Sequence, residues 1–459
     1  MARDPQEPEV PFREGSARGE SRSTFARIAK NVGWVAGSRG FNLTLSVVYL
    51  AFTARALGPE KFGVFALILT YAQLIANFVQ FQSWKGIIRY GAIHLAAGRH
   101  DHLERLFGFT AALDFGSAIV GALIAILCVP VVGPLLHWAP DEQFAAAAFA
   151  GVLLLTTGAT PSGILRLCNR FDLAAFCEAT GPLLRLAGAL IGWMMGAGPI
   201  WFLIVWAAAG FAQAAAQWFT AIVINGSRLA LSRSAFGQAL RENERLWRFM
   251  LQTNISNSVS MFWTQLGTLA VGAVAGPADA GAFRLAQRLS KGIVRPVQPV
   301  TLAVYPELSR LAAEENFKEV RKIVTHATMM ASALALAIVL TIAFGGREIL
   351  HLVAGKRFEF AHAYLFMLAA ATAIDLAGFA LEPVQNAFGR SWKVLRSKLI
   401  AAAVYAFLLV VLLPTIGGRG AAIAAIVCSL LIFAQLAYYT AKLLRSGPTA
   451  PAVAAHETQ

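Results

Sequence analysis

Apolar residues in this chain form long runs that are separated by short polar connections. Twelve runs approach the length of about 20 residues that a helix needs to cross ~30 Å of hydrocarbon. The runs lie near residues 32–55, 62–82, 107–133, 144–166, 173–197, 199–225, 250–274, 281–305, 324–345, 360–382, 396–414 and 420–442. The pattern predicts an all-α polytopic membrane protein with about 12 transmembrane helices.

Composition supports a membrane protein and excludes several other classes. Of the 459 residues, 57% are hydrophobic and 14% are charged, whereas charged residues make up about a quarter of a soluble globular domain. The four cysteines show no C-x-x-C spacing and the eight histidines show no metal-ligand spacing, so we expect neither a metal site nor a cofactor. The chain contains no G-x-x-x-x-G-K-[ST] phosphate loop, and we do not expect an enzyme.

The basic residues predict the orientation in the membrane. One side of the predicted topology holds 27 of the 39 lysines and arginines, and the opposite side holds five. Because lysine and arginine are enriched in cytoplasmic loops, both termini are predicted to be cytoplasmic. The net charge of +14 is therefore interpreted as a topology signal, and we expect no nucleic-acid partner.

The two halves of the chain repeat one motif. Residues 57–67 and 275–285 share the pattern G-P-x-x-x-G-x-F-x-L, with Gly276 following Gly58 at an offset of 218 residues. Each half contains six spans, so the halves enter the membrane in the same direction as parallel repeats around a central cavity. The predicted parts are a cytoplasmic tail with a short amphipathic helix (1–31), an N-terminal six-helix lobe (32–225), a basic cytoplasmic linker (226–249), a C-terminal six-helix lobe (250–445) and a cytoplasmic tail (446–459).

Four cations follow one face of the eighth span. Arg284, Arg288, Lys291 and Arg295 are separated by four, three and four residues, which places them on a stripe about 60° wide and ~16 Å long. In contact with lipid, four cations would cost on the order of 10–14 kcal/mol. We therefore expect the stripe to face water, an acidic partner or an anion, and we interpret it as functional.

Polar residues on spans 1, 2 and 7 extend this face. The repeat maps the stripe onto a span 2 face that includes Gln73 and Asn77, and spans 1 and 7 carry polar residues at helical spacing. These spans are expected to line one polar, net-positive chamber. The predicted substrate-binding residues are Arg39, Asn42, Gln73, Asn77, Asn257, Arg284, Arg288, Lys291 and Arg295.

Acidic residues within the spans have more than one interpretation. Asp114, Asp375 and Glu382 could each carry a coupling proton or act as counter-ions to the basic stripe. Glu178 and Arg185 are seven residues apart on one helix face, which favours a structural charge relay over a role in transport.

Several short segments resemble one family of transporters. Residues 53–63 (TARALGPEKFG) are similar to the a-R-x-L-G-P-x-x-[YF]-G signature of bacterial polysaccharide-repeat-unit flippases, members of the multidrug/oligosaccharidyl-lipid/polysaccharide exporter superfamily. Residues 163–172, 386–390 and 417–424 resemble later segments of the same family. The resemblance extends over roughly residues 25–445.

This resemblance implies a two-lobed flippase that works by alternating access. Its substrate would be a polyprenyl-pyrophosphate-linked oligosaccharide, such as an O-antigen, lipopolysaccharide or exopolysaccharide repeat unit, moved from the inner to the outer leaflet of the bacterial cytoplasmic (inner) membrane. Membrane lipids and a polysaccharide polymerase or export machinery would be its other partners. Bidentate arginine contacts suit the pyrophosphate oxygens.

Three other functions remain open from the sequence. A multidrug or toxin extruder of the same superfamily would bind organic cations with acidic residues in its cavity. The net charge of the chamber therefore distinguishes the two functions, since a positive chamber favours the flippase. A lipid II flippase is a closer alternative, although such proteins usually have fourteen spans. A membrane-embedded glycan polymerase or ligase would need a large extracytoplasmic loop, which the hydropathy pattern does not show.

Overall fold

The computed structural model describes residues 17–225, 233–294, 308, 310–311, 314 and 316–446. Within these residues the chain forms helices and no strand. Apolar runs favour helices in a membrane because hydrocarbon offers no partner to backbone N–H and C=O groups, which a helix satisfies internally. The prediction of an all-α protein is confirmed.

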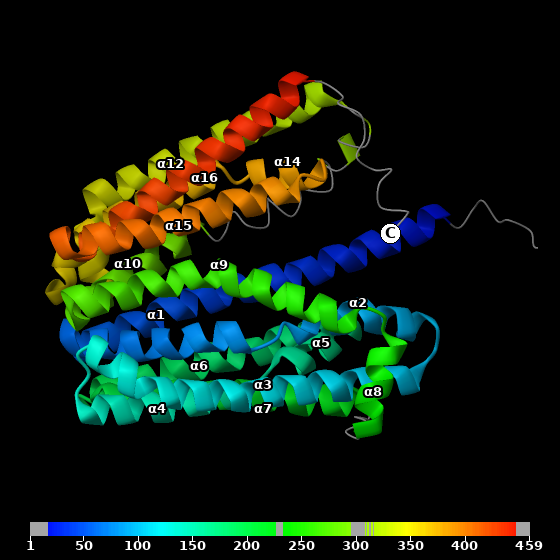
Figure 1. The fold of residues 1–459 in the computed structure, drawn as a ribbon, viewed down its shortest axis with the longest axis horizontal. Helices are drawn as coiled ribbons and strands as arrows, with labels where there is room; N and C mark the ends of the chain where they lie inside the picture. The colour runs from blue at the N-terminus through cyan, green and yellow to red at the C-terminus, as the bar shows by residue number, and fades with distance from the viewer. Residues whose placement is uncertain are drawn as a thin grey trace, which may run out of the picture.

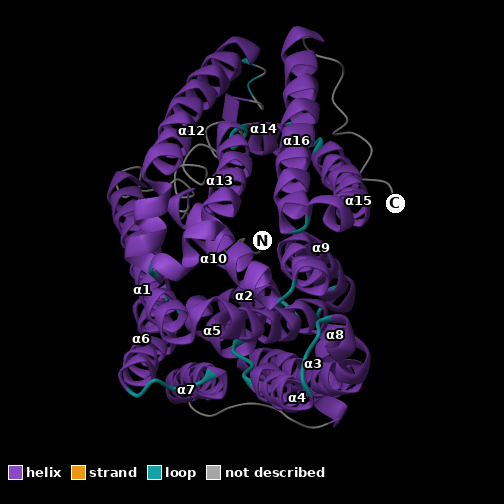
Figure 2. Cartoon of the chain, turned by 90° about the vertical axis from the view of Figure 1, so that its left-hand side faces the viewer, coloured by secondary structure: helices purple, strands orange, loops and turns teal. Residues whose placement is uncertain are grey.

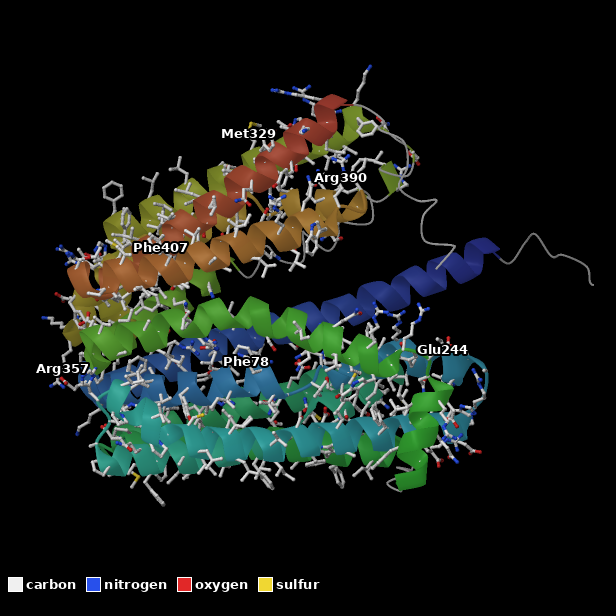
Figure 3. The ribbon with its side chains drawn as sticks, viewed as in Figure 1. Phe78, Glu244, Met329, Arg357, Arg390 and Phe407 are labelled. Atoms are coloured by element: carbon white, nitrogen blue, oxygen red, sulfur yellow. The ribbon has the colours of Figure 1, made fainter. Side chains whose placement is uncertain are left out.

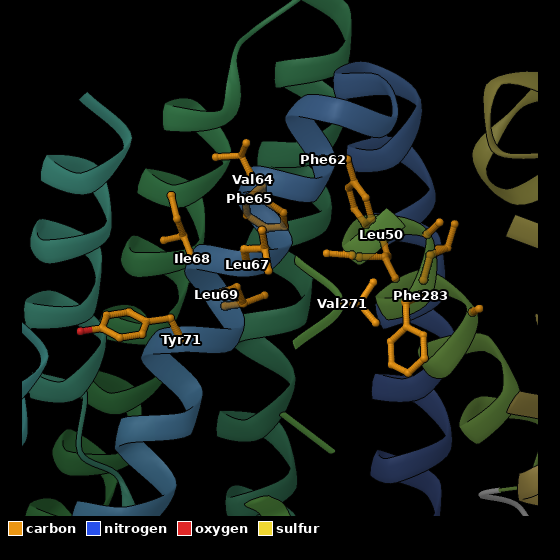
Figure 4. Packing of buried hydrophobic residues seen from close by; sticks show 14 of the residues in the cluster. Leu50, Phe62, Val64, Phe65, Leu67, Ile68, Leu69, Tyr71, Val271 and Phe283 are labelled. Atoms are coloured by element: carbon orange, nitrogen blue, oxygen red, sulfur yellow. The ribbon is translucent and has the colours of Figure 1, made fainter. Parts of the chain in front are cut away.

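The N-terminal half begins with a long helix that reverses at a glycine. Gly58 has φ 70° and ψ 175° inside α1 (Ala17–Val79), a conformation that glycine adopts without a steric penalty. Two arms result, one on each side of the kink, and Figure 4 shows them side by side. The other helices of this half are α2 (Ser83–Ala96), α3 (His100–Leu135), α4 (Pro140–Leu155), α5 (Ala159–Leu167), α6 (Phe171–Met194) and α7 (Pro199–Asn225).

The C-terminal half repeats this order of helices. Gly276, which matches Gly58 in the repeated motif, has φ 89° and ψ 174° and separates the two helices that correspond to the arms of α1. The helices are α8 (Arg233–Glu242), α9 (Leu246–Ala275), α10 (Pro277–Val294), α12 (Phe317–Ala354), the 3₁₀ helix η2 (Lys356–Ala361), α13 (His362–Ala377), α14 (Leu381–Ala387), α15 (Ser391–Ile416) and α16 (Gly418–Ser446).

The helices agree with the predicted spans. Nine stretches of the described residues are long and apolar enough to cross a membrane, and the first, Gly40–Ala96, includes most of the first predicted span and all of the second. The predicted seventh and eighth spans are α9 and α10. Composition alone does not identify α10 as a span because it carries Arg284, Arg288 and Lys291. The fold therefore has the expected twelve spans in two six-helix lobes.

The two lobes meet at one end and diverge toward the other. Figure 2 shows α12–α16 on one side and α2–α8 on the other, with α9 and α10 between them. In Figures 1 and 3 the lobes are close at the end that carries Arg357 and separate toward the end that carries Glu244 and Arg390. We call the first the closed end and the second the open end.

Aromatic and aliphatic side chains hold the closed end together. Phe62, Phe65, Phe283 and Phe358 are almost completely buried in one cluster that includes residues of both lobes, and Figure 4 shows part of it. The rings of Phe62 and Phe358 meet edge to face with centroids 5.6 Å apart, a geometry that adds to the gain from burial. This contact joins the N-terminal lobe directly to the C-terminal lobe.

One helix in each lobe is interrupted at a corresponding place. Residues 156–158 separate α4 from α5, and residues 378–380 separate α13 from α14. A backbone carbonyl freed by such a break needs a new partner inside a membrane. The indole Nε1 of Trp218 supplies one by donating to the carbonyl of Thr157 at 2.9 Å. Breaks of this kind typically border polar cavities.

Candidate functional site

The cationic stripe lies on α10, between the lobes. Arg284 and Arg288 are half-buried, and Lys291 is exposed. Arg295 lies outside the described residues, as do the side chains of Arg39 and Asn257. The part of the predicted site that the structure describes therefore comprises the first three cations and the polar residues around them.

Arg284 is bound by two glutamines from different lobes. Its Nη2 donates to Oε1 of Gln73 at 2.7 Å, and its Nη1 donates to Oε1 of Gln265 at 2.8 Å. Gln73 comes from the second arm of α1 and Gln265 comes from α9. Because both acceptors are neutral amides, they satisfy the donors without cancelling the positive charge. The structure brings together two of the predicted binding residues, Gln73 and Arg284. Gln265, which was not among the predicted binding residues, is the second acceptor for Arg284.

Asn77 lies one turn beyond Gln73, and its backbone carbonyl accepts a hydrogen bond from α9. Ser258 Oγ donates to the carbonyl of Asn77 at 2.7 Å, and Asn254 Nδ2 donates to the carbonyl of Phe78 at 3.2 Å. These bonds fix the second arm of α1 against α9 between the two lobes. Asn42 does not join this group, because it lines a separate cavity within the N-terminal lobe.

A cavity of about 960 Å³ opens in the C-terminal lobe beside the stripe. Lys291 and Gln287 reach it from α10, and the acid Asp375 reaches it from α13. Asp375 interacts electrostatically with Lys291 and accepts a hydrogen bond from Ser429. Most of the remaining wall is apolar, including Ile255, Leu368, Leu395, Leu399 and Ile432. We call this space the C-lobe cavity.

The C-lobe cavity is not the chamber of spans 1, 2, 7 and 8 that the sequence predicts, and its charges balance. Its described lining holds two cations, Lys291 and Lys398, and two acids, Asp375 and Glu382, so it is formally neutral and not net-positive. The acids come from α13 and α14, and the sequence analysis named both as candidate counter-ions of the stripe. Asp375 interacts with Lys291 of the stripe, whereas Glu382 pairs with Lys398 on α15. The excess positive charge instead lies at Arg284 and Arg288, for which the described residues provide no carboxylate within 4 Å.

Asp114 has a structural environment. It accepts the N–H of Thr160 at 2.9 Å and the hydroxyl of the same residue at 2.7 Å, and Ser83 donates to its other oxygen. The carboxylate thereby caps the N-terminus of α5, where acceptors stabilise free N–H groups. These contacts do not include a cation of the stripe.

Two further acids form ion pairs whose partners the sequence analysis missed. Glu178 accepts from Arg166 at 2.9 Å, and Glu382 accepts from Lys398 at 2.8 Å. Arg185, the predicted relay partner of Glu178, instead places its guanidinium 5.2 Å from the ring centre of Trp206. Arg166 and Lys398 lie on helices that neighbour those of their acids, so spacing along a single helix does not reveal the pairs.

The described residues contain no group of three or more histidine, cysteine, aspartate or glutamate side chains that could hold a metal ion. The chemistry that they offer is binding by hydrogen bonds, fixed charge and apolar surface.

Comparison with known proteins agrees with this description. A family described as polysaccharide biosynthesis proteins matches residues 28–312. The inner membrane protein YghQ of Escherichia coli (strain K12) is 27% identical over 341 residues, which cover 73% of this chain and 94% of that protein.

Two solved structures share the fold. The inward-facing conformation of a multidrug resistance MATE family transporter of the MOP superfamily superposes with a TM-score of 0.70 at 15% identity, over 89% of this chain and 96% of that one. The lipid II flippase MurJ in an inward closed conformation gives a TM-score of 0.66 at 12% identity, over 88% and 86% of the two chains. With the fold of the MOP superfamily transporters and a family match over more than half of its length, this chain belongs to the polysaccharide biosynthesis protein family.

Proposed function

We propose that the protein is a flippase for polyprenyl-pyrophosphate-linked oligosaccharides. It would move polysaccharide repeat units from the inner to the outer leaflet of the cytoplasmic membrane by alternating access of the two lobes. Membership of the polysaccharide biosynthesis family and the transporter fold support a role in glycan export. The specific substrate is argued below from the residues between the lobes.

The observation that carries the proposal is the environment of Arg284. A half-buried cation between two lobes, whose hydrogen bonds among the described residues go to neutral amides, keeps its charge available for an anion. Its two described hydrogen bonds use two of the five N–H donors of a guanidinium. Arg288 adds a second guanidinium one turn further along α10. A pyrophosphate, with about two negative charges and several acceptor oxygens, matches this pair.

The C-lobe cavity suits the lipid side of the same molecule. It begins at Lys291, next to the stripe, and continues along an apolar wall formed by α13, α15 and α16. A polyprenyl chain gains free energy on such a surface in proportion to the apolar area that it buries. The charged group and the chain can therefore bind at adjoining surfaces of different polarity.

The orientation follows from the distribution of lysine and arginine. That distribution predicts that α8 and both termini are cytoplasmic, and the open end of the two lobes would then face the cytoplasm and the inner leaflet. The closed end then faces outward. With the interior negative, moving two negative charges outward gains ~4–5 kcal/mol per 100 mV, so the potential alone can drive export.

The test is a double neutralisation on α10. Arg288→Gln with Lys291→Gln should abolish surface polysaccharide while the protein still inserts at its normal level. A matched control is Arg170→Gln with Lys322→Gln, which removes two exposed charges outside the lobe interface. Wild-type polysaccharide in the α10 double variant would overturn the proposal, and so would changed drug susceptibility with intact polysaccharide.

A further inference from the structure

The N-terminal lobe contains a second cavity, of about 520 Å³, that the proposed function does not use. We call it the N-lobe cavity. It lies at the break between α4 and α5, and α1, α2, α6 and α7 complete its wall. Its size falls within the range of ~300–1,000 Å³ that is typical of small-molecule sites.

Unlike the C-lobe cavity, the N-lobe cavity is lined mainly by polar side chains. They include Arg166, Glu178, Arg185, Gln213 and Gln217. These residues occur on helices long enough to cross the membrane, where charged and amide groups are costly and mark functional sites by default. Helix packing alone does not require polar side chains at such a position, because apolar side chains would pack there at a lower cost.

The charges in the N-lobe cavity sum to one excess positive charge. Arg166 and Glu178 form an ion pair at 2.9 Å, which leaves Arg185 as the second cation. The guanidinium of Arg185 lies over Trp206, and its Nε is buried with no hydrogen-bond partner among the described residues. An unused buried donor costs about 1–3 kcal/mol, so the site is incomplete without an acceptor.

A second unused group in the cavity lining comes from α1. Oδ1 of Asn42, on α1, is also buried without a described partner. Gln213 and Gln217 supply amide groups from α7, one turn apart. The cavity therefore offers one fixed cation together with several neutral donors and acceptors.

From these groups we infer that the N-lobe cavity binds a carboxylate-bearing sugar of the transported oligosaccharide, with Arg185 on the carboxylate and the amides on the hydroxyls. The inference rests on the proposed function for the origin of the sugar. A carboxylate has one negative charge, which matches the single excess cation. A pyrophosphate has about two negative charges, and Glu178 would repel it.

The two cavities then divide the substrate between the lobes. The sugar binds in the polar N-lobe cavity, the pyrophosphate lies at Arg284 and Arg288, and the lipid extends along the C-lobe cavity. This division explains why one lobe has a polar cavity and the other a larger, mainly apolar one, although the lobes are repeats of one fold.

The inference can be tested with free ligands on the purified full-length protein. Calorimetric titration with glucuronate should show binding that glucose, which lacks the carboxylate, does not match. Arg185→Gln should weaken glucuronate binding tenfold or more, because it removes a charge-assisted contact of about 1.5–3 kcal/mol. Arg170→Gln, an exposed arginine paired with Asp172 outside the cavity, is the matched control and should bind normally.

Further variants separate this inference from the proposed function. Arg288→Gln with Lys291→Gln should leave glucuronate binding unchanged but weaken the binding of inorganic pyrophosphate. If that double variant still exports polysaccharide while Arg185→Gln loses glucuronate, the proposed function fails and the sugar site stands. If Arg185→Gln does not fold, Gln217→Leu replaces it and should also weaken glucuronate binding. Equal affinity for glucose and glucuronate, or unchanged glucuronate affinity in a folded cavity variant, would overturn the inference.

Discussion

Gly63 and Gly281 occupy the same position in the two copies of the repeated motif, and they lie against each other between the lobes. A Cβ atom on Gly281 would be 2.9 Å from the Cα of Gly63, and a Cβ atom on Gly63 would be 1.8 Å from the carbonyl oxygen of Pro277. The backbones of α1 and α10 therefore touch directly, as small residues allow in membrane helices. The repeat thus supplies both sides of the closed end.

Because of this contact, we expect a single added methyl group to lower the stability of the protein. Gly63→Ala should lower the thermal unfolding temperature of the detergent-purified protein, because the backbones of α1 and α10 must move apart. Overpacking of this kind typically costs ~1–3 kcal/mol. Gly116→Ala is the control, since a Cβ atom there meets nothing within 4 Å, and it should melt at or above the wild-type temperature. Equal unfolding temperatures for Gly63→Ala and the wild type would show that α1 and α10 can move apart without a loss of stability.

Much of the fold could be predicted from the sequence because its signals are local. The apolar runs of spanning length predicted the helices, and the G-P motif predicted the repeat. The structure adds that the chain reverses at Gly58 and Gly276 within that motif. The breaks before α5 and α14 were not predicted, since each interrupts a run that remains apolar on both sides. Their partners, such as Trp218 for the carbonyl of Thr157, come from other helices.

The candidate site was predicted less completely. The spacing of cations on α10 is visible within one helix, and the repeat pointed to Gln73. Asp375 and Glu382 were named as candidate counter-ions, but the partner of each was not predicted, because Asp375 reaches Lys291 and Glu382 reaches Lys398 only after α10, α13, α14 and α15 pack together. The N-lobe cavity was not predicted for the same reason, since its lining residues come from several helices.

The amides around Arg284 predict the effect of an isosteric change. Gln73→Glu should place a carboxylate 2.7 Å from the Arg284 guanidinium and neutralise it with an ion pair. Transport of a lipid-linked oligosaccharide into proteoliposomes should then fall at least tenfold, while the protein remains folded. Gln238→Glu, on the exposed surface of α8, is the matched control. Unchanged transport in Gln73→Glu would argue that the charge of Arg284 does not act on the substrate.

The ion pairs that follow the two helix breaks have opposite polarity in the two lobes. In the N-terminal lobe the cation Arg166 is on the short helix α5 and the acid is on α6, whereas in the C-terminal lobe the acid Glu382 is on the short helix α14 and the cation is on α15. Each pair fixes a short half-helix after a break. We therefore expect stability to depend on the presence of an acid and a cation in each pair, and not on which of the two helices carries which charge.

A charge exchange tests this expectation. Glu382→Lys alone should lower the yield of folded protein on size-exclusion chromatography, because it places two lysines side by side next to the C-lobe cavity. Combining it with Lys398→Glu should restore most of the yield. Exposed pairs contribute only ~0.2–1 kcal/mol, so the repulsion in the single variant is expected to dominate. A double variant as poor as the single one would assign Glu382 a role beyond the pair.

The orientation of the lobes predicts which residues are reachable from outside the cell. Asp101 lies in the first turn of α3 and Asp141 lies in the first turn of α4. Both side chains are exposed, and they flank the two ends of α3. In a Cys168→Ser background, which removes the exposed native cysteine, Asp141→Cys should react with a membrane-impermeant maleimide in intact spheroplasts. Asp101→Cys should react only after permeabilisation, because the lysine and arginine bias places the start of α3 in the cytoplasm. The reverse pattern would put the open end of the lobes outside, and the pyrophosphate would then meet Arg284 and Arg288 from the wrong side for export.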